Sequence, residues 1–177
     1  VFSNGTNAND AWQLTTGGFR LDSQPTNNDN LTLQSDFHAG RMNETYTALY
    51  HLPSSSDPSY SWTQPSTSTA WGANILSRWQ HAISETDNLS LQIYYDHYQR
   101  DFYILGEKRD TVDFDFQHRF AASQRQDIIW GLSYRYSHDK VESSQMFVME
   151  DPEKGFSMYS IFLQDEITLL PNTLSLI

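Results

Sequence analysis

Apolar and polar residues alternate along most of this chain, and this period of two constrains its fold more strongly than any other feature. In the segment 30–38, two leucines and a phenylalanine at odd positions alternate with polar side chains at even positions. This pattern is typical of β-strands with one apolar and one polar face, whereas helical periodicity is nearly absent. The predicted strands cover about 11–23, 30–39, 70–83, 88–100, 110–121, 127–137 and 157–170, with the start of an eighth at 174–177.

The connections between these strands alternate in length along the chain. Short, turn-like segments at 24–29, 84–87, 122–126 and 171–173 alternate with longer ones at 40–69, 101–109 and 138–156. In an antiparallel up-and-down sheet, this order places the short turns at one end and the long loops at the other. The predicted strands also exceed the usual ~5–6 residues of soluble sheets and match tilted membrane strands. The sequence therefore predicts an all-β, antiparallel up-and-down transmembrane β-barrel.

The first predicted strand departs from strict alternation. Trp12 and Leu14 share one parity, whereas Phe19 and Leu21 share the other. The pair Gly17-Gly18 lies between them, where a β-bulge would insert an extra residue and restore the facing. We therefore expect all four apolar side chains on one face.

The composition excludes several classes of protein. The 177 residues carry 22 acidic and 11 basic side chains, and the net charge of −11 argues against nucleic-acid binding, which needs clustered Lys and Arg. The absence of cysteine excludes disulfide scaffolds, thiolate metal sites and cysteine nucleophiles. No apolar stretch reaches the about 18 residues of a transmembrane helix. An aromatic content of 14% argues against intrinsic disorder.

The predicted polar faces carry Arg and Asp in the middle of strands, whereas lysine occurs only at Lys108, Lys140 and Lys154, all in predicted loops. A polar barrel lumen crossed by charge networks has this composition. The side chains expected to face the lumen are Asp36, Arg78, Asp96, Asp113, Asp115, Arg119 and Arg135. Asp113 and Asp115 share one side of a strand, and we expect Arg78 and Arg119 to supply counter-charges in a hydrogen-bonded network.

Aromatic residues gather near the strand ends on the predicted outward faces. They are Trp12, Trp71, Trp79, Phe120, Trp130, Tyr134 and Tyr136. These positions suit the girdles of membrane barrels, where an amphipathic ring lies at the level of the lipid headgroups. The alternative is that Trp and Tyr favour strands in general and pack in a soluble core.

Five strings of the sequence resemble barrel strands of TonB-dependent outer-membrane receptors. The first combines Trp12-Gln13-Leu14 and Gly18–Asp22 with Asp29–Asp36 (DNLTLQSD). The second, Trp71–Trp79 (WGANILSRW), resembles a strand start of that family with the pattern GxNxLxRW. The others are Phe116–Phe120 (FQHRF), Ile129–Tyr136 (IWGLSYRY) and Phe162–Leu169 (FLQDEITL), the last similar to the family's FxQDE strand.

The resemblance covers nearly the whole chain and implies a barrel of about 22 strands, plugged by an N-terminal domain. Members of this family lie in the outer membrane of Gram-negative bacteria. They import scarce ligands, mostly ferric siderophores, haem or cobalamin, with energy passed through TonB. Lipid, the plug and TonB are thus the implied partners of the full-length protein, which would be a transporter and not an enzyme. The plug and the TonB-contacting segment are missing from 1–177, so we expect a piece of a longer barrel and an open, curved sheet.

Ligand contacts are expected on the longer loops, because scaffolds often carry binding residues on connecting segments. The candidates are Arg41, Tyr46, Tyr50, Tyr60 and Trp62 in the segment 40–69, with Met146 and Phe147 in the segment 138–156. Aromatic side chains there can stack on catecholate, porphyrin or corrin surfaces. Packing of the loops against themselves is the alternative.

No motif for catalysis or for a cofactor occurs, since a nucleophile elbow, a Gly-rich phosphate loop and an HExxH sequence are all missing. The six histidines lack a ligand spacing and fall on different strand faces, so no metal site is predicted. Asp165 and Glu166 are adjacent and should point to opposite faces near the short-turn rim, which does not make a catalytic pair.

Two other functions remain open at this point. A soluble all-β carbohydrate-binding module with Tyr and Trp platforms would require the apolar faces to meet a second sheet within the chain. A passive porin-type channel would share the barrel and lack a plug, so the sequence upstream of residue 1 would separate it from a TonB-dependent receptor.

Overall fold

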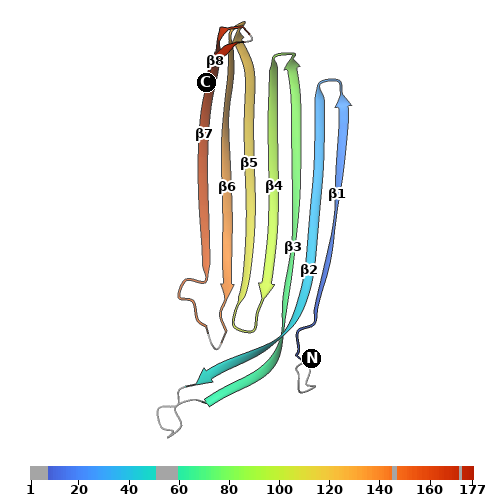
Figure 1. Cartoon of the computed structure of the whole chain (residues 1–177), viewed down its shortest axis with the longest axis vertical. Coiled ribbons are helices and arrows are strands. Elements are labelled where there is room, and N and C mark those ends of the chain that lie inside the picture. Colours follow the sequence, from blue (N-terminus) through green and yellow to red (C-terminus); the bar gives the residue numbers. More distant parts are fainter. Residues whose placement is uncertain (1–7, 51–59, 145–146, 172) are drawn as a thin grey trace.

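The computed structural model describes residues 8–50, 60–144, 147–171 and 173–177. They form one antiparallel sheet of eight strands, whose order in space is their order along the chain (Figure 1). The strands are β1 Trp12–Thr26, β2 Asp29–Tyr50, β3 Tyr60–Ser84, β4 Asp87–Asp101, β5 Gly106–Ser123, β6 Gln126–Glu142, β7 Glu153–Leu170 and β8 Leu174–Leu176. The predicted all-β, up-and-down antiparallel arrangement is confirmed. Among these residues, no helix is long and apolar enough to cross a membrane.

The strands are longer than predicted, and the longer connections are correspondingly shorter. The predicted loop 40–69 is wrong, because β2 and β3 pair without interruption from Asp29 opposite His81 to Tyr50 opposite Tyr60. The other two long connections shrink to 102–105 and 143–152. The segment 60–69 is rich in Ser and Thr and poor in apolar residues. Backbone pairing therefore continues there although the alternation that signals a strand has faded.

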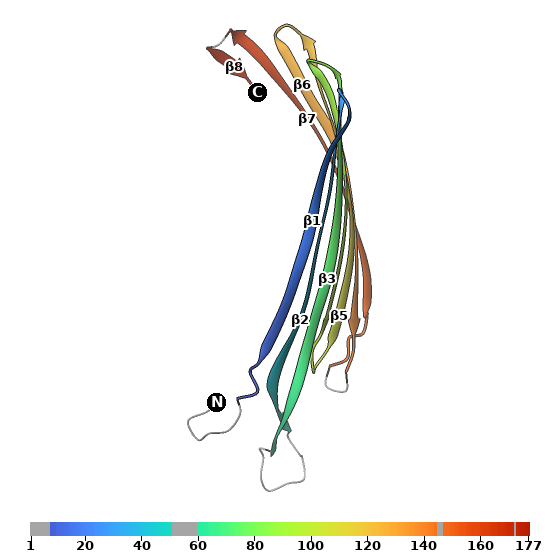
Figure 2. The same ribbon diagram turned by 90° about the vertical axis from the view of Figure 1, so that its right-hand side faces the viewer.

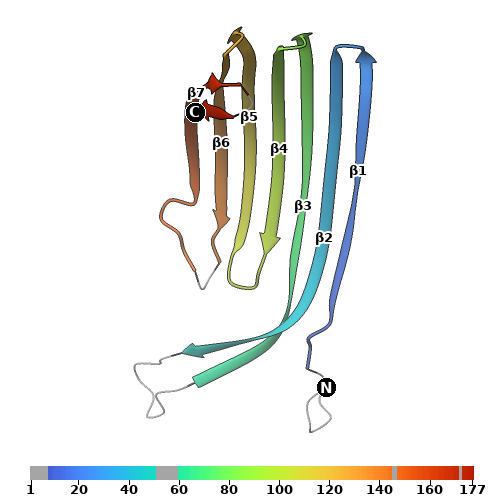
Figure 3. The ribbon, with the colours of Figure 1, turned by 45° about the horizontal axis from the view of Figure 1, so that its top comes forward.

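Beyond Met42 and before Thr69, β2 and β3 leave the sheet as a two-stranded arm (Figures 1 and 3). The ladder between β1 and β2 ends at Met42, and the ladder between β3 and β4 ends at Thr69. The Tyr46 ring of the arm packs on Tyr103 of the β4–β5 connection, with 5.0 Å between ring centroids. An isolated hairpin is marginally stable in water, so this contact helps to hold the base of the arm.

The described sheet is open, as expected, with β1 and β8 at its edges. Figure 2 shows that it is also curved and twisted along its length. Each strand contacts only its neighbours in the sheet, so no second layer covers either face of the described sheet. Large apolar side chains consequently stay exposed, among them Ile161 at 81% and Leu163 at 74%.

The expected bulge at Gly17-Gly18 is wrong. The register of β1 with β2 runs without a shift from Trp12 opposite Met42 to Ser23 opposite Leu31. The glycines instead make room for side chains of β2, since a Cβ at Gly17 would lie 2.5 Å from the Phe37 ring. Trp12 therefore lies on the face opposite to Phe19, together with Leu14, and Trp12 does not belong to the outward aromatic set.

Candidate functional site

The register divides the sheet into an apolar face and a polar face, because directly paired residues of antiparallel strands point to the same side. Three successive rows of the apolar face cross the sheet from strand to strand. The rows are Leu31, Trp79, Leu91, Phe116, Leu132 and Ile161; then Leu21, Leu33, Ser77, Ile93, Phe114, Tyr134 and Tyr159; then Phe19, Ser35, Ile75, Tyr95, Val112, Tyr136 and Ser157. The result is one continuous apolar band without a charged residue.

Aromatic side chains lie near both borders of this apolar band. Trp71 and Trp79 share its face on β3, eight residues apart, which is about 27 Å along an extended strand. The three apolar rows themselves span four residues on β3, from Ile75 to Trp79, which is about 14 Å along the strand, and the row that contains His97 and Asp110 lies between them and Trp71. Phe120 and Trp130 lie on the same face near the short turns.

The short-turn border of the apolar band carries two clusters of histidine, aspartate and tryptophan. In the first, His81 Nδ1 lies 2.7 Å from Asp29 Oδ1, and the Trp79 indole N–H donates to the same carboxylate at 2.9 Å. In the second, His118 Nε2 lies 2.9 Å from Asp87 Oδ1, and the Trp130 indole N–H donates to His118 Nδ1 at 3.1 Å. The histidine, aspartate and tryptophan side chains of these two clusters thus have partners, which reduces the cost of placing them beside apolar surface.

A third cluster lies on the opposite border of the band. His97 Nδ1 is 2.8 Å from Asp110 Oδ1, and the Tyr95 hydroxyl donates to the same oxygen at 2.6 Å. The Trp71 ring packs on His97 with 4.5 Å between centroids. The six histidines were expected to be scattered without a metal-ligand spacing, and the sequence spacing did not predict that three of them pair with Asp. Asp29 and His81 are far apart in the sequence, and only the register between β2 and β3 brings them together. The spacing of residues along the sequence therefore could not predict the pair.

Hydrogen bonds lower the pKa of Asp29, which follows the β1–β2 turn, to about 2. The largest cause is the bond from the Thr26 hydroxyl, followed by those from His81 and Trp79. These bonds stabilise the charged carboxylate, so Asp29 stays ionised at pH values at which an aspartate is usually protonated.

At the other end of the sheet, past the apolar band, two Lys–Glu pairs cross the strands. Lys108 Nζ lies 2.6 Å from Glu142, and Lys140 Nζ lies 2.5 Å from Glu153. The hydrogen bond from each lysine lowers the pKa of its glutamate. Lys108 and Lys140 were expected in loops; they lie instead at the ends of β5 and β6, where strands continue beyond the apolar band.

The seven residues predicted to face a lumen all share the polar face. Their hydrogen bonds run mostly to neighbours on the same face: Gln34 to Asp36, Tyr94 to Asp96, Gln117 to Asp115, Arg78 to Gln92, Arg135 to Asp113 and Arg119 to Asp127. The face therefore carries a ladder of short-range polar contacts. Whether it lines a lumen stays a prediction.

The expected counter-charges of the aspartates are wrong in detail. Arg135 Nε, not Arg119, lies 2.7 Å from Asp113 Oδ2, because these two residues are direct register partners on β5 and β6. Arg119 donates through Nε to Asp127 at 2.8 Å, and Arg78 donates to the amide oxygen of Gln92 at 3.0 Å. Register decides the partners, and it cannot be read from the parity of a single strand.

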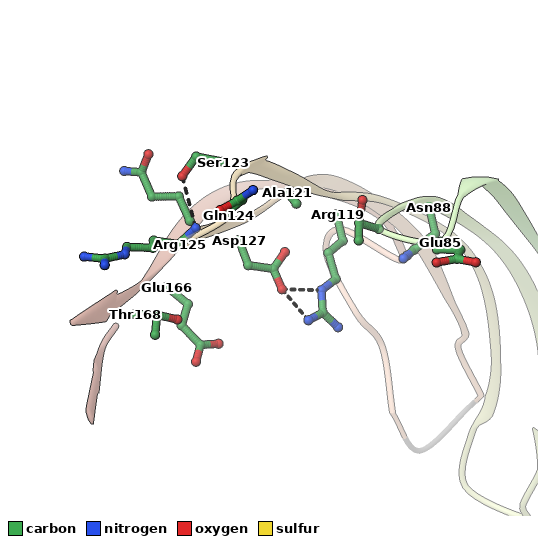
Figure 4. A pocket seen from close by; sticks show the side chains of 12 residues that line it. Glu85, Asn88, Arg119, Ala121, Ser123, Gln124, Arg125, Asp127, Glu166 and Thr168 are labelled. Carbon is green, nitrogen blue, oxygen red and sulfur yellow. Dashed lines mark hydrogen bonds and ion pairs between the residues drawn. The ribbon is translucent and has the colours of Figure 1, made fainter. Parts of the chain in front are cut away.

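A polar cavity of about 400 Å³ lies on the polar face next to the short turns (Figure 4). Arg119 and Asp127 point toward one another across its lining, and Glu166 lies nearby on β7. Glu166 and Asp165 lie on opposite faces, as predicted, since Glu166 is opposite Asp127 and Asp165 is opposite Ile128. The charged lining can hydrogen-bond a polar partner and offers little apolar contact.

The predicted loop residues are not brought into one site among the described residues. Arg41 and Tyr46 lie in β2, not in a loop, and Phe147 lies in the β6–β7 connection with 41% exposure. Its backbone bonds to Ser144 in the same connection, which is a contact of the loop with itself. Tyr50, Tyr60 and Trp62 lie at the ends of β2 and β3, with side chains outside the described part, and Met146 also lies outside the described residues.

Within the described ranges, no group of three His, Asp or Glu side chains is arranged to hold a metal ion. No protein-family model, no curated protein and no solved structure matches this chain.

Proposed function

We propose that residues 1–177 form part of the wall of an outer-membrane β-barrel of the TonB-dependent receptor type. In this role the apolar face contacts lipid, the polar face lines the lumen, and the longer connections face outward. The complete protein would take up a scarce ligand such as a ferric siderophore, haem or cobalamin, energised through TonB and without enzymatic activity.

The observation that carries the proposal is the apolar band of a single-layered sheet. Its rows of Leu, Ile, Phe and Tyr have no covering layer within the described chain, and in water such a surface would be far larger than monomeric proteins expose. A bilayer is a solvent in which this band is favourable and in which the alternating polar face can line a lumen.

Two further observations support the same proposal. The strands contain 15 to 25 residues apart from the short β8, so they are long enough to cross a bilayer at a tilt and to continue beyond it. Charged pairs on the apolar side occur outside the three apolar rows, at Lys108–Glu142 and Lys140–Glu153. The five sequence strings that resemble TonB-dependent receptors support this class of barrel in the proposal.

The soluble carbohydrate-binding alternative requires a second sheet over the apolar face, and the described residues form only one. A passive porin-type channel needs the same wall and is the second candidate. Sequence encoded immediately before residue 1 separates the two, because a plug-like domain there supports the receptor, and a signal peptide followed directly by barrel strands supports the passive channel.

Fractionation of the cell tests the location. The gene product that contains this chain is expected in the outer-membrane fraction, released only by detergent. Its recovery as a soluble periplasmic monomer would contradict the proposal.

A further inference from the structure

A groove interrupts the polar face at the end of the sheet that carries the longer connections. It has a volume of about 260 Å³, and its lining includes Trp12, Leu14, Gly40, Met42, Ala70 and Arg100. These residues come from β1 to β4. The groove exists because Trp12 and Leu14 lie on the polar face, opposite to the side that sequence alternation predicted for them.

The strand register explains the shape of the groove. Leu14, Gly40, Ala70 and Arg100 are successive partners across four strands. The small residues Gly40 and Ala70 form its floor, and the large side chains at the two ends of the row form its walls. The next row on the same face pairs Trp12 with Met42, and the Trp12 side chain there is 73% exposed. The floor and one wall are therefore apolar.

The opposite wall carries the positive charge of Arg100, which has no carboxylate partner among the described residues. The Arg100 guanidinium carbon lies 3.7 Å from the centroid of the Phe102 ring, so the ring supports the flat cation. Glu107 is its register partner, and no hydrogen bond or ion pair joins the two. Arg41 also borders the groove, but its register partners Gln13 and Thr69 place its side chain on the opposite face.

Most arginines of the polar face have a carboxylate partner, and Arg78 bonds to the Gln92 amide instead. Arg109, Arg119 and Arg135 each pair with an aspartate on the same face. An unpaired arginine beside an apolar floor complements a ligand that has an apolar body and an anionic group, because a guanidinium binds a carboxylate through two parallel hydrogen bonds.

We propose that the groove binds a small amphipathic carboxylate, with its apolar body over Gly40 and Ala70 beside Trp12 and its carboxylate against Arg100. The volume of about 260 Å³ lies below the range of about 300–1,000 Å³ for drug-sized ligands, which favours a small molecule. The inference rests on the geometry of the polar face and does not require that the other face contacts lipid.

Ligand-observed NMR titration tests this binding with a matched pair of probes, 3-phenylpropionate and its neutral amide. The full chain is used in phosphatidylcholine vesicles, with chain-free vesicles as the blank, or in buffer if it does not enter lipid. The result is therefore independent of the membrane proposal. The acid is expected to bind saturably and about tenfold more tightly than the amide, since a hydrogen bond to a charged group contributes about 1.5–3 kcal/mol.

Variants locate the site. Arg100→Gln is expected to raise the Kd of the acid about tenfold and to leave that of the amide nearly unchanged, whereas Trp12→Ala weakens both probes. Arg78→Gln is the matched control, because it removes from the same face, away from the groove, an arginine that bonds to the Gln92 amide and makes no ion pair, and it should change neither Kd. Circular dichroism verifies that each variant folds. Equal binding of acid and amide, no saturable binding, or an equal loss in Arg78→Gln and Arg100→Gln would overturn the proposal.

Discussion

His81 lies directly across the β2–β3 ladder from Asp29, and its Nδ1 is 2.7 Å from the carboxylate, to which the Trp79 indole also donates a hydrogen bond. A titratable pair is thus fixed beside an aromatic ring at the border of the apolar band. Its position outside the three apolar rows, next to the β1–β2 turn, makes the consequences for pH measurable.

We expect Asp29 to make the fold sensitive to acid. Its pKa falls from 3.8 to about 2 in the folded chain, so the charged form stabilises the fold above about pH 4, and this contribution is lost as the pH falls toward 2. Urea unfolding followed by circular dichroism between pH 2 and 6 measures the effect. Asp29→Asn should flatten the profile in that window, whereas Asp151→Asn, which removes a carboxylate without a described hydrogen bond, should retain the slope of the wild type.

The ion pair between Arg135 and Asp113 should contribute measurably but modestly to stability. Arg135 is half exposed, and exposed pairs contribute about 0.2–1 kcal/mol, so a double-mutant cycle of Arg135→Gln and Asp113→Asn should give a coupling free energy of about 0.5–1 kcal/mol. The same cycle with Arg78→Gln and Asp113→Asn is the control, and its effects should add because Arg78 bonds to Gln92 instead. Equal coupling in both cycles would contradict the register-specific pair.

Gly131 should tolerate no side chain. A Cβ at this position would lie 2.6 Å from the Phe116 carbonyl oxygen and 2.5 Å from the Phe162 ring, so the backbone of β5 would have to move. We expect Gly131→Ala to lower the free energy of unfolding by about 1–3 kcal/mol. In Gly40→Ala, the nearest atom is the flexible end of Leu14 at 3.3 Å, and the change should remain within about 0.5 kcal/mol. Similar losses in both variants would contradict this account.

Adjacent residues of β6 should respond oppositely to a positive charge. Leu132 lies in the first apolar row, whereas Ser133 lies on the polar face opposite Ser160. If the apolar band contacts lipid, Leu132→Arg should destabilise the chain in phosphatidylcholine vesicles by about 1–2 kcal/mol, because Leu132 shares the row of Trp79 and lies between an interface, where Arg costs about 0–1 kcal/mol, and the midplane, where it costs about 2–4 kcal/mol. Ser133→Arg should unfold close to the wild type. An unchanged stability of Leu132→Arg would contradict the proposal and indicate that the apolar face contacts water.

Alternation predicted the eight strands and most of their faces, because successive side chains of a strand point to opposite sides of the sheet. It placed Asp113 and Arg135 on the same face, which the structure confirms. It could not predict that they pair with each other, because partners across strands depend on the register between two segments. The three His–Asp pairs were missed for the same reason.

Alternation was misleading where backbone geometry or small residues intervene. At Gly17-Gly18 a change of parity suggested a bulge, whereas the absent side chains accommodate Phe37 and the register continues. Because no residue is inserted there, Trp12 lies on the polar face and lines the groove, whereas it was expected in the outward aromatic girdle. In the segment 60–69, Ser and Thr sustain a strand without apolar residues, so its length was underestimated.

A cysteine scan along β6 tests the central claim most directly, because the chain has no cysteine of its own. Single variants carry a nitroxide label in phosphatidylcholine vesicles, and electron paramagnetic resonance compares access of lipid-soluble oxygen with that of a water-soluble nickel chelate. The scanned substitutions are Leu132→Cys, Ser133→Cys, Tyr134→Cys, Arg135→Cys, Tyr136→Cys and Ser137→Cys. Our account predicts a period of two, with oxygen access dominant at the even positions and nickel access dominant at the odd positions. Uniform access of the nickel chelate at all six positions would contradict it.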